Sequence, residues 1–171
     1  CSSLTTIPSL DTSKVTNISS MFNGCSSLTT IPSLDTSKVT NISSMFNGCS
    51  SLTTIPSLDT SKVTNIFSMF NGCSSLQEVP ALNMSAVTSI SSIFGTASSG
   101  RLTSLTRMRA FGSRYGFILQ GTKMDATAIN EVFQNLGTAY NASQTIDVRN
   151  NPGSAGCDPS IATAKGFTVL R

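Results

Sequence analysis

The sequence has 171 residues, of which 39% are hydrophobic and 11% charged, and it contains neither His nor Trp. A formal net charge of +3 is too small to predict binding to nucleic acid. The lack of His excludes catalysis in which His activates a Ser or Cys nucleophile. No apolar run has the length of a membrane span, so no membrane insertion is expected.

Residues 1–96 consist of four copies of a 24-residue repeat. The first two copies are identical (CSSLTTIPSLDTSKVTNISSMFNG), the third differs only at Phe67, and the fourth has diverged. A fixed period of this length is typical of a solenoid, in which each repeat forms one coil that needs its neighbours for stability. Because the chain begins with Cys1 inside a repeat, we expect a fragment or a processed piece of a longer protein.

Each repeat predicts a coil made of one short strand and one short helix. In the first copy, residues 4–7 suit a strand that ends at Pro8, because proline has no N–H for a ladder. Asp11, Thr12 or Ser13 is expected to cap a helix whose apolar face comprises Val15, Ile18, Met21 and Phe22. The predicted fold is therefore an α/β repeat solenoid of right-handed, leucine-rich-repeat-like coils with parallel strands.

One cysteine recurs in each coil, at Cys1, Cys25, Cys49 and Cys73. A metal site or a disulfide ladder would be the functional interpretation, but zinc sites require CxxC pairs or His ligands, and the sequence has neither. We expect a ladder of inward side chains that pack as small apolar groups. No metal and no cofactor are predicted.

Thr5, Thr29 and Thr53 are also expected to stack, one above another. A regular row of hydroxyl groups suits a glycan or even ice. The alternative is a solvated sheet edge with good strand propensity. Gln77 occupies the equivalent position of the fourth copy and interrupts the row, which weakens the ice hypothesis.

Residues 97–171 are predicted to form irregular coils and an α/β cap that continues the solenoid. The irregular coils occupy residues 101–119. A helix is expected over 124–136, strands over 145–148 and 167–170, and a short helix from Asp158-Pro159. This part carries eight basic and four acidic residues, against three and four in the repeats. A cap is needed because a bare last coil exposes apolar surface and unpaired strand edges.

The stretch from Arg107 to Tyr115 is the most unusual part of the cap. Arg107 and Arg109 lie on one face if this segment is a strand. Arginines beside aromatic rings suit carboxylate-bearing sugars or a protein partner. The candidate ligand-binding residues here are Arg107, Arg109, Phe111, Arg114 and Tyr115. A solvated, charged strand face is the alternative.

Two parts of the chain resemble known families. The repeat core, LDTSKVTNISSMFNGCSSLTTIP at residues 10–32, resembles the BspA-like leucine-rich repeats of bacterial surface proteins, and the resemblance extends over residues 1–96. MDATAINEVFQNLGTA and TIDVRNNPGSAGCDPSIATAKGFTVL, within residues 122–170, resemble C-terminal segments of bacteriophage tail-fibre and other tail-associated proteins. The first resemblance implies adhesion at a cell surface and the second implies a phage virion, and neither supplies catalytic residues.

Together, the residues and the resemblances predict a non-enzymatic surface-recognition module on the tail or fibre of a virion. Its expected partners are a host cell-surface glycan or protein and other virion proteins or copies of itself. Two alternatives stay open: a structural spacer or decoration module of a virion, and a bacterial cell-surface adhesin.

Overall fold

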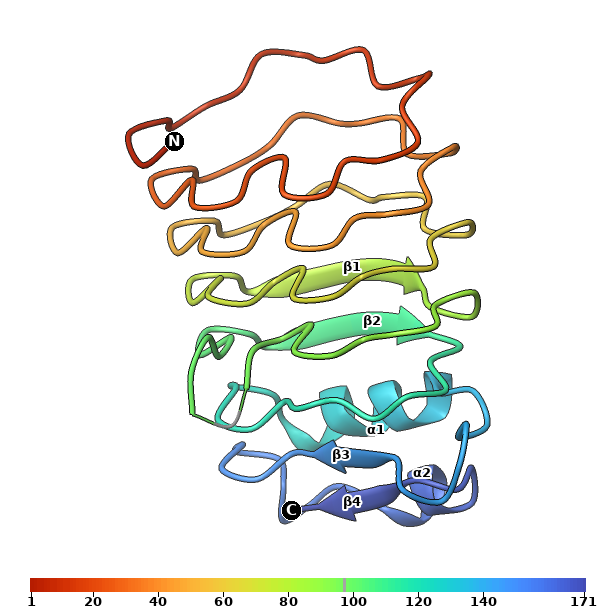
Figure 1. Ribbon diagram of the computed structural model, residues 1–171. Helices are drawn as coiled ribbons and strands as arrows, with labels where there is room; N and C mark the ends of the chain where they lie inside the picture. The colour runs from red at the N-terminus through yellow and green to blue at the C-terminus, as the bar shows by residue number, and fades with distance from the viewer. Residues whose placement is uncertain (97) are drawn as a thin grey trace.

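Successive repeats are stacked along one axis in the computed structural model, which describes residues 1–96 and 98–171 (Figure 1). We call the four repeats coils 1 to 4, in chain order. Each coil has a strand side, made by the segment equivalent to residues 4–10, and a turn side, made by the segment equivalent to residues 16–24. The N-terminus lies at one end of the stack and the C-terminus near the other.

Hydrogen bonds between neighbouring coils hold the turn side together. From coil 1 to coil 2, the backbone N–H groups of alternate residues donate to carbonyls one repeat further along the chain: Ile18 to Asn41 (3.1 Å), Ser20 to Ser43 (2.9 Å), Phe22 to Met45 (3.0 Å) and Gly24 to Asn47 (2.8 Å). Coils 2 and 3 repeat the pattern. The 24-residue period of the sequence therefore reappears as a hydrogen-bond period.

The core consists of columns of identical side chains. Phe22, Phe46, Phe70 and Phe94 stack with centroid separations of 5.8, 5.8 and 6.0 Å, and Phe117 of the cap meets Phe94 edge-on. Leu, Ile, Val and Met form parallel columns beside the rings. Burial of each such side chain stabilises the fold by roughly 1.5–3 kcal/mol, and stacking is what provides that burial.

The predicted helix of each repeat is wrong. The segments containing Val15, Ile18, Met21 and Phe22 form a series of turns, with bonds such as that from the Met21 N–H to the Ile18 carbonyl (3.3 Å). Every second N–H donates to the next coil, so it is not free for the i−4 carbonyl of a helix. Ser20 has φ = 57° and takes the chain through the left-handed region.

The predicted strands are correct only in part. Coils 1 to 3 carry no regular strand on the strand side, whereas coil 4 contains β1, Glu78–Asn83. The expected end at proline is wrong in that coil, because β1 runs through Pro80. The parallel pairing with β2 shifts register between Val79 and Leu82, so Pro80 lies in a bulge where a missing N–H is tolerated.

The cap continues both sides of the stack (Figure 1). It contains β2 (Arg107–Phe111), α1 (Ala126–Asn135), β3 (Thr145–Asp147), α2 (Ser160–Thr163) and β4 (Thr168–Leu170). On the strand side, β2 pairs parallel with β1 and α1 packs beside β2. On the turn side, Ile118 bridges to Asp147 of β3, which pairs parallel with β4.

Prediction was more successful in the cap than in the repeats. α1, β3 and β4 lie within the segments expected to hold them, and α2 follows Asp158-Pro159 as expected. Asp125 caps α1, because its Oδ1 accepts the N–H of Ala128 (2.8 Å). The exception is residues 101–119, which were expected to be irregular and contain β2.

Candidate functional site

Arg107 and Arg109 lie on the exposed face of β2, and both are occupied by carboxylates of the protein itself. The Arg107 Nη2 is 2.8 Å from Glu131 Oε2, and its Nε donates to the same oxygen (2.9 Å). The Arg109 Nε lies 3.8 Å from Glu131 and 3.9 Å from Glu78. Two arginines thus meet two glutamates, and the group has no net charge to attract an acidic sugar.

A hollow of about 460 Å³ lies beside this ion-pair cluster. It is lined by Arg107, Thr127, Asn130, Glu131 and Gln134. All of these side chains are polar, and no aromatic ring lines the hollow. The ion-pair cluster is therefore a surface network that joins β2 to α1 rather than a preformed anion site.

Arg114 and Tyr115 belong to a separate cluster with Tyr140, which we call the tyrosine patch. The rings of Tyr115 and Tyr140 stack at 5.5 Å with 23° between their planes. The guanidinium carbon of Arg114 lies 5.7 Å from the centroid of the Tyr140 ring, a cation–π distance. Tyr140 is 59% exposed, so the outer part of this stack faces solvent.

Glycines allow the two segments of the tyrosine patch to approach each other. Gly112 has φ = 74°, and a side chain there would meet Ser85 at 3.0 Å. A Cβ on Gly137 would lie 2.9 Å from the Gly112 carbonyl oxygen. The contact is closed by the Tyr140 N–H, which donates to the Arg114 carbonyl (2.8 Å). A backbone hydrogen bond and close glycine contacts therefore fix the two segments of the patch relative to each other.

Sequence reasoning found two of the three residues of the tyrosine patch and missed Tyr140. The composition could have indicated Tyr140, because Tyr115 and Tyr140 are the two tyrosines of the chain. Phe111, another of the candidate ligand-binding residues, lies at the end of β2 and is 42% exposed.

The threonine row on the strand side is not a uniform array of free hydroxyl groups. Thr5 and Thr29 are exposed but Thr53 is half-buried, and its Oγ1 donates to the Thr29 carbonyl (3.3 Å). A more regular row lies on the turn side, where all members are exposed: Thr16, Thr40, Thr64 and Thr88. There too the hydroxyls of the last three donate to the preceding threonine's carbonyl (3.2–3.4 Å).

All four cysteines of the column are free, and all but the first are buried. Cys25, Cys49 and Cys73 are buried, whereas Cys1, expected to point inward, is exposed because no coil precedes it in the structure. The Sγ of Cys49 donates to the Phe22 carbonyl (3.0 Å). Burial raises the pKa of Cys49 to about 11 and raises that of Cys73 further. These thiols are protonated at neutral pH and are poor nucleophiles.

The aspartate of coils 1 to 3 stabilises a turn instead of a helix. Asp11 Oδ1 accepts hydrogen bonds from both the hydroxyl (2.7 Å) and the N–H (3.0 Å) of Ser13, which lower the pKa of its carboxyl group. Asp35 and Asp59 accept the equivalent N–H. Lys38 follows Asp35 by three residues, and its Nζ donates to the Ser13 carbonyl (2.9 Å).

No group of three or more His, Cys, Asp or Glu side chains is placed to hold a metal ion among residues 1–96 and 98–171. In that same part of the chain, the helices are too short or too polar to cross a bilayer.

The fold and these surfaces define a class: a repeat protein with one capped end, in which the two tyrosines and most of the charged residues lie in the cap. The chain belongs to the family described as "Mycoplasma protein of unknown function, DUF285", which matches residues 2–106. That range covers the repeats and ends just before β2, so the tyrosine patch lies outside it. No curated protein and no solved structure matches the chain.

Proposed function

We propose that this protein is a non-enzymatic surface-recognition module that binds its ligand through the tyrosine patch. The observation that carries the proposal is the exposed Tyr140 ring, stacked on Tyr115 and beside Arg114. Tyr and Arg dominate binding hot spots, because they offer large rigid contact areas together with hydrogen-bonding groups. The tyrosines of the chain are Tyr115 and Tyr140, so the patch differs chemically from the Ser- and Thr-rich repeats.

The ligand class that suits the patch is a host cell-surface glycan or protein. A ring face with a hydroxyl edge and a guanidinium matches a ligand that offers both apolar and hydrogen-bonding surface. Arg107 and Arg109, although predicted as binding residues, contribute less in this proposal because Glu131 and Glu78 already occupy them.

We place the module on a virion tail or fibre, on the resemblance of residues 122–170 to phage tail-associated proteins. The alternative is a bacterial cell-surface adhesin, which the BspA-like resemblance of residues 1–96 favours. We also propose that the stack be classed with leucine-rich-repeat-like solenoids. The inter-coil hydrogen bonds and the columns of Leu and Phe support that classification.

A second candidate function is a structural spacer of a virion. It is favoured by the near identity of coils 1 to 3, since a spacer needs length and regularity rather than a particular surface. A spacer binds its neighbours in the particle and does not bind host cells.

The test is the binding of the fluorescently labelled chain to a panel of intact bacteria. We expect saturable binding to one host, weakened roughly tenfold or more by Tyr140→Ala and by Arg114→Ala. The matched control is Phe67→Ser, which removes another exposed aromatic side chain and restores the residue found in coils 1 and 2. Equal binding by all variants would exclude the tyrosine patch, and no binding to any cell would favour the spacer.

A further inference from the structure

Coil 1 exposes an apolar surface that the other coils have covered. Met21 is 37% exposed, whereas its equivalent in coil 2, Met45, is fully buried. Leu10 and Val15 are half-buried, while the equivalent Leu34 and Val39 are buried. In coils 2 and 3 this surface is covered by the preceding coil.

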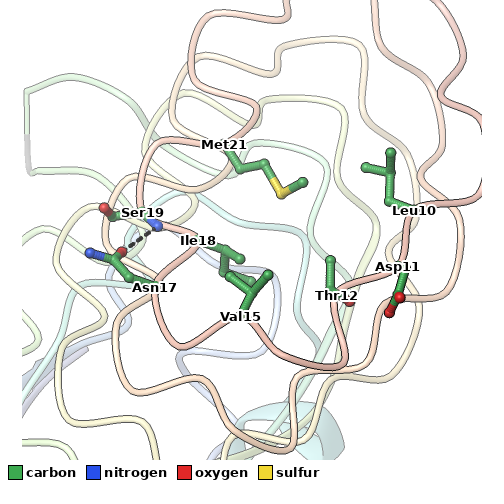
Figure 2. A pocket seen from close by; sticks show the side chains of 8 residues that line it. All are labelled: Leu10, Asp11, Thr12, Val15, Asn17, Ile18, Ser19 and Met21. Carbon is green, nitrogen blue, oxygen red and sulfur yellow. Dashed lines mark hydrogen bonds between the residues drawn. The ribbon is translucent and has the colours of Figure 1, made fainter.

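The exposed side chains surround a defined hollow. Its volume is about 360 Å³, and its lining includes Leu10, Val15, Ile18 and Met21. Figure 2 shows these four side chains pointing toward the same space, with the polar side chains of Asp11 and Asn17 at its margin. If one more coil were stacked on coil 1, its apolar side chains would extend the columns of the core into this hollow.

Along residues 17–23, the backbone at this end offers a row of carbonyl acceptors to a further coil. In coil 2, the carbonyls of Asn41, Ser43, Met45 and Asn47 accept N–H groups from coil 1. Among residues 1–96 and 98–171, no backbone N–H donates to the equivalent carbonyls of coil 1, which are those of Asn17, Ser19, Met21 and Asn23. An exposed edge of this kind is a template for pairing with another chain.

The chemistry of this edge selects its partner. The partner must bring N–H groups at every second residue, and apolar side chains between them. The opposite side of a repeat coil carries both: in coil 1, the N–H groups of Ile18, Ser20, Phe22 and Gly24, and the ring of Phe22. If two copies of this chain met at their open ends, each would present the carbonyls of residues 17–23. Two rows of acceptors cannot hydrogen-bond to each other.

We infer that the open end of the stack is a docking surface for one further coil of the same 24-residue repeat, in register with coil 1. The docked coil donates its alternate N–H groups to the carbonyls of Asn17, Ser19, Met21 and Asn23. Its phenylalanine continues the ring column beyond Phe22, and its apolar side chains cover Met21.

The experiment adds one repeat (CSSLTTIPSLDTSKVTNISSMFNG) before Cys1 of the full chain and measures oxidation of Met21 by hydrogen peroxide. Both proteins carry Ser33→Thr, an exposed substitution that gives the tryptic peptide containing Met21 its own mass. In the chain without the added repeat, Met21 should oxidise roughly tenfold or more faster than Met45, because oxidation follows exposure. With the added repeat, the Met21 rate should fall by that same factor, and the thermal midpoint should rise by about 4 °C or more.

The matched control is an added repeat with aspartate at the positions equivalent to Ile18 and Phe22. It should leave Met21 as reactive as in the chain without an addition. The inference is overturned if the unaltered added repeat also leaves the Met21 oxidation rate and the thermal midpoint unchanged. It is equally overturned if the chain without an addition dimerises as concentration rises and Met21 becomes protected, because the occupant is then a second copy.

Discussion

Cys1, Cys25, Cys49 and Cys73 hold the same position in consecutive coils, yet their environments differ. Cys1 is exposed at the open end, and the others are enclosed between coils. Cys157, in the cap, is buried as well, and burial raises the pKa of its thiol. Because alkylating reagents attack an accessible thiolate, burial separates the other four cysteines from Cys1. At Cys49, Cys73 and Cys157 a raised pKa adds to that difference.

We therefore predict that iodoacetamide at pH 8 modifies one cysteine, Cys1, at least roughly 100-fold faster than the other four. Burial holds the pKa of Cys49 at about 11, so little thiolate forms at this pH while the coil stays closed, and alkylation has to wait for transient opening of the coil. Intact mass should show a single early adduct. The control in concentrated guanidinium chloride should show five adducts, and a second fast adduct in the folded protein would contradict the prediction.

The candidate site shows which of its residues a sequence can indicate. Strand alternation placed Arg107 and Arg109 on one face, and both are exposed on β2, as is Phe111, for which no face was predicted. The sequence did not indicate that Glu131, on a helix 24 residues away, would neutralise both arginines. Tyr140 joins Tyr115 by a similar long-range contact, and local patterning holds no information on such contacts.

At the scale of elements, local patterning succeeded where bonding is local. α1 has its apolar face and its capping Asp125 within one stretch of sequence, and it was found. In the repeats, an apolar spacing that fits a helix is realised as turns, because the N–H groups bond to the next coil. The same apolar spacing is thus compatible with a helix and with a series of turns. Which of the two forms depends on hydrogen bonds to the next coil, which a single repeat does not contain.

The C-terminal end of α1 depends on one side chain from a distant turn. The Nζ of Lys165 donates to the carbonyls of Phe133 (3.1 Å), Gln134 (2.6 Å) and Leu136 (2.8 Å). These are carbonyls that a helix end leaves unpaired, and a cation there also interacts favourably with the helix dipole. The neighbouring Ala139 N–H donates to the Lys165 carbonyl (2.8 Å), so this lysine also anchors the turn that carries Tyr140.

We predict that Lys165→Met lowers the free energy of unfolding by about 1–2 kcal/mol, because charge-assisted hydrogen bonds are lost while the aliphatic stem is kept. Urea denaturation monitored by circular dichroism would measure the change. The control is Lys123→Met, at an exposed lysine, which should change stability by less than about 0.5 kcal/mol. Equal effects of the two substitutions would show that the three bonds contribute nothing.

At the scale of the whole molecule, the stack is a sum of similar interfaces. Coil 1 meets coil 2 through the same bonds by which coil 2 meets coil 3, and the Phe22–Phe46 and Phe46–Phe70 separations are both 5.8 Å. Phe67, the one residue that distinguishes coil 3 from coils 1 and 2, is exposed. The buried surface of coil 3 is thus equally suited to contact coil 1, because coils 1 and 2 are identical in sequence.

This equivalence predicts the outcome of deleting residues 25–48. Coil 1 should then dock directly on coil 3, with Phe22 stacked on Phe70 and the Cys73 thiol donating to the Phe22 carbonyl as Cys49 does now. Since each coil stabilises the stack mainly through its neighbours, the shortened protein should lose stability yet unfold in one cooperative transition. Small-angle X-ray scattering should show a particle shorter by about 4.8 Å, the spacing of parallel strands. If the deletion instead abolished the near-UV signal and expanded the chain, coils 1 and 3 would not be interchangeable, and the length of the array would be fixed by contacts that the repeats do not share.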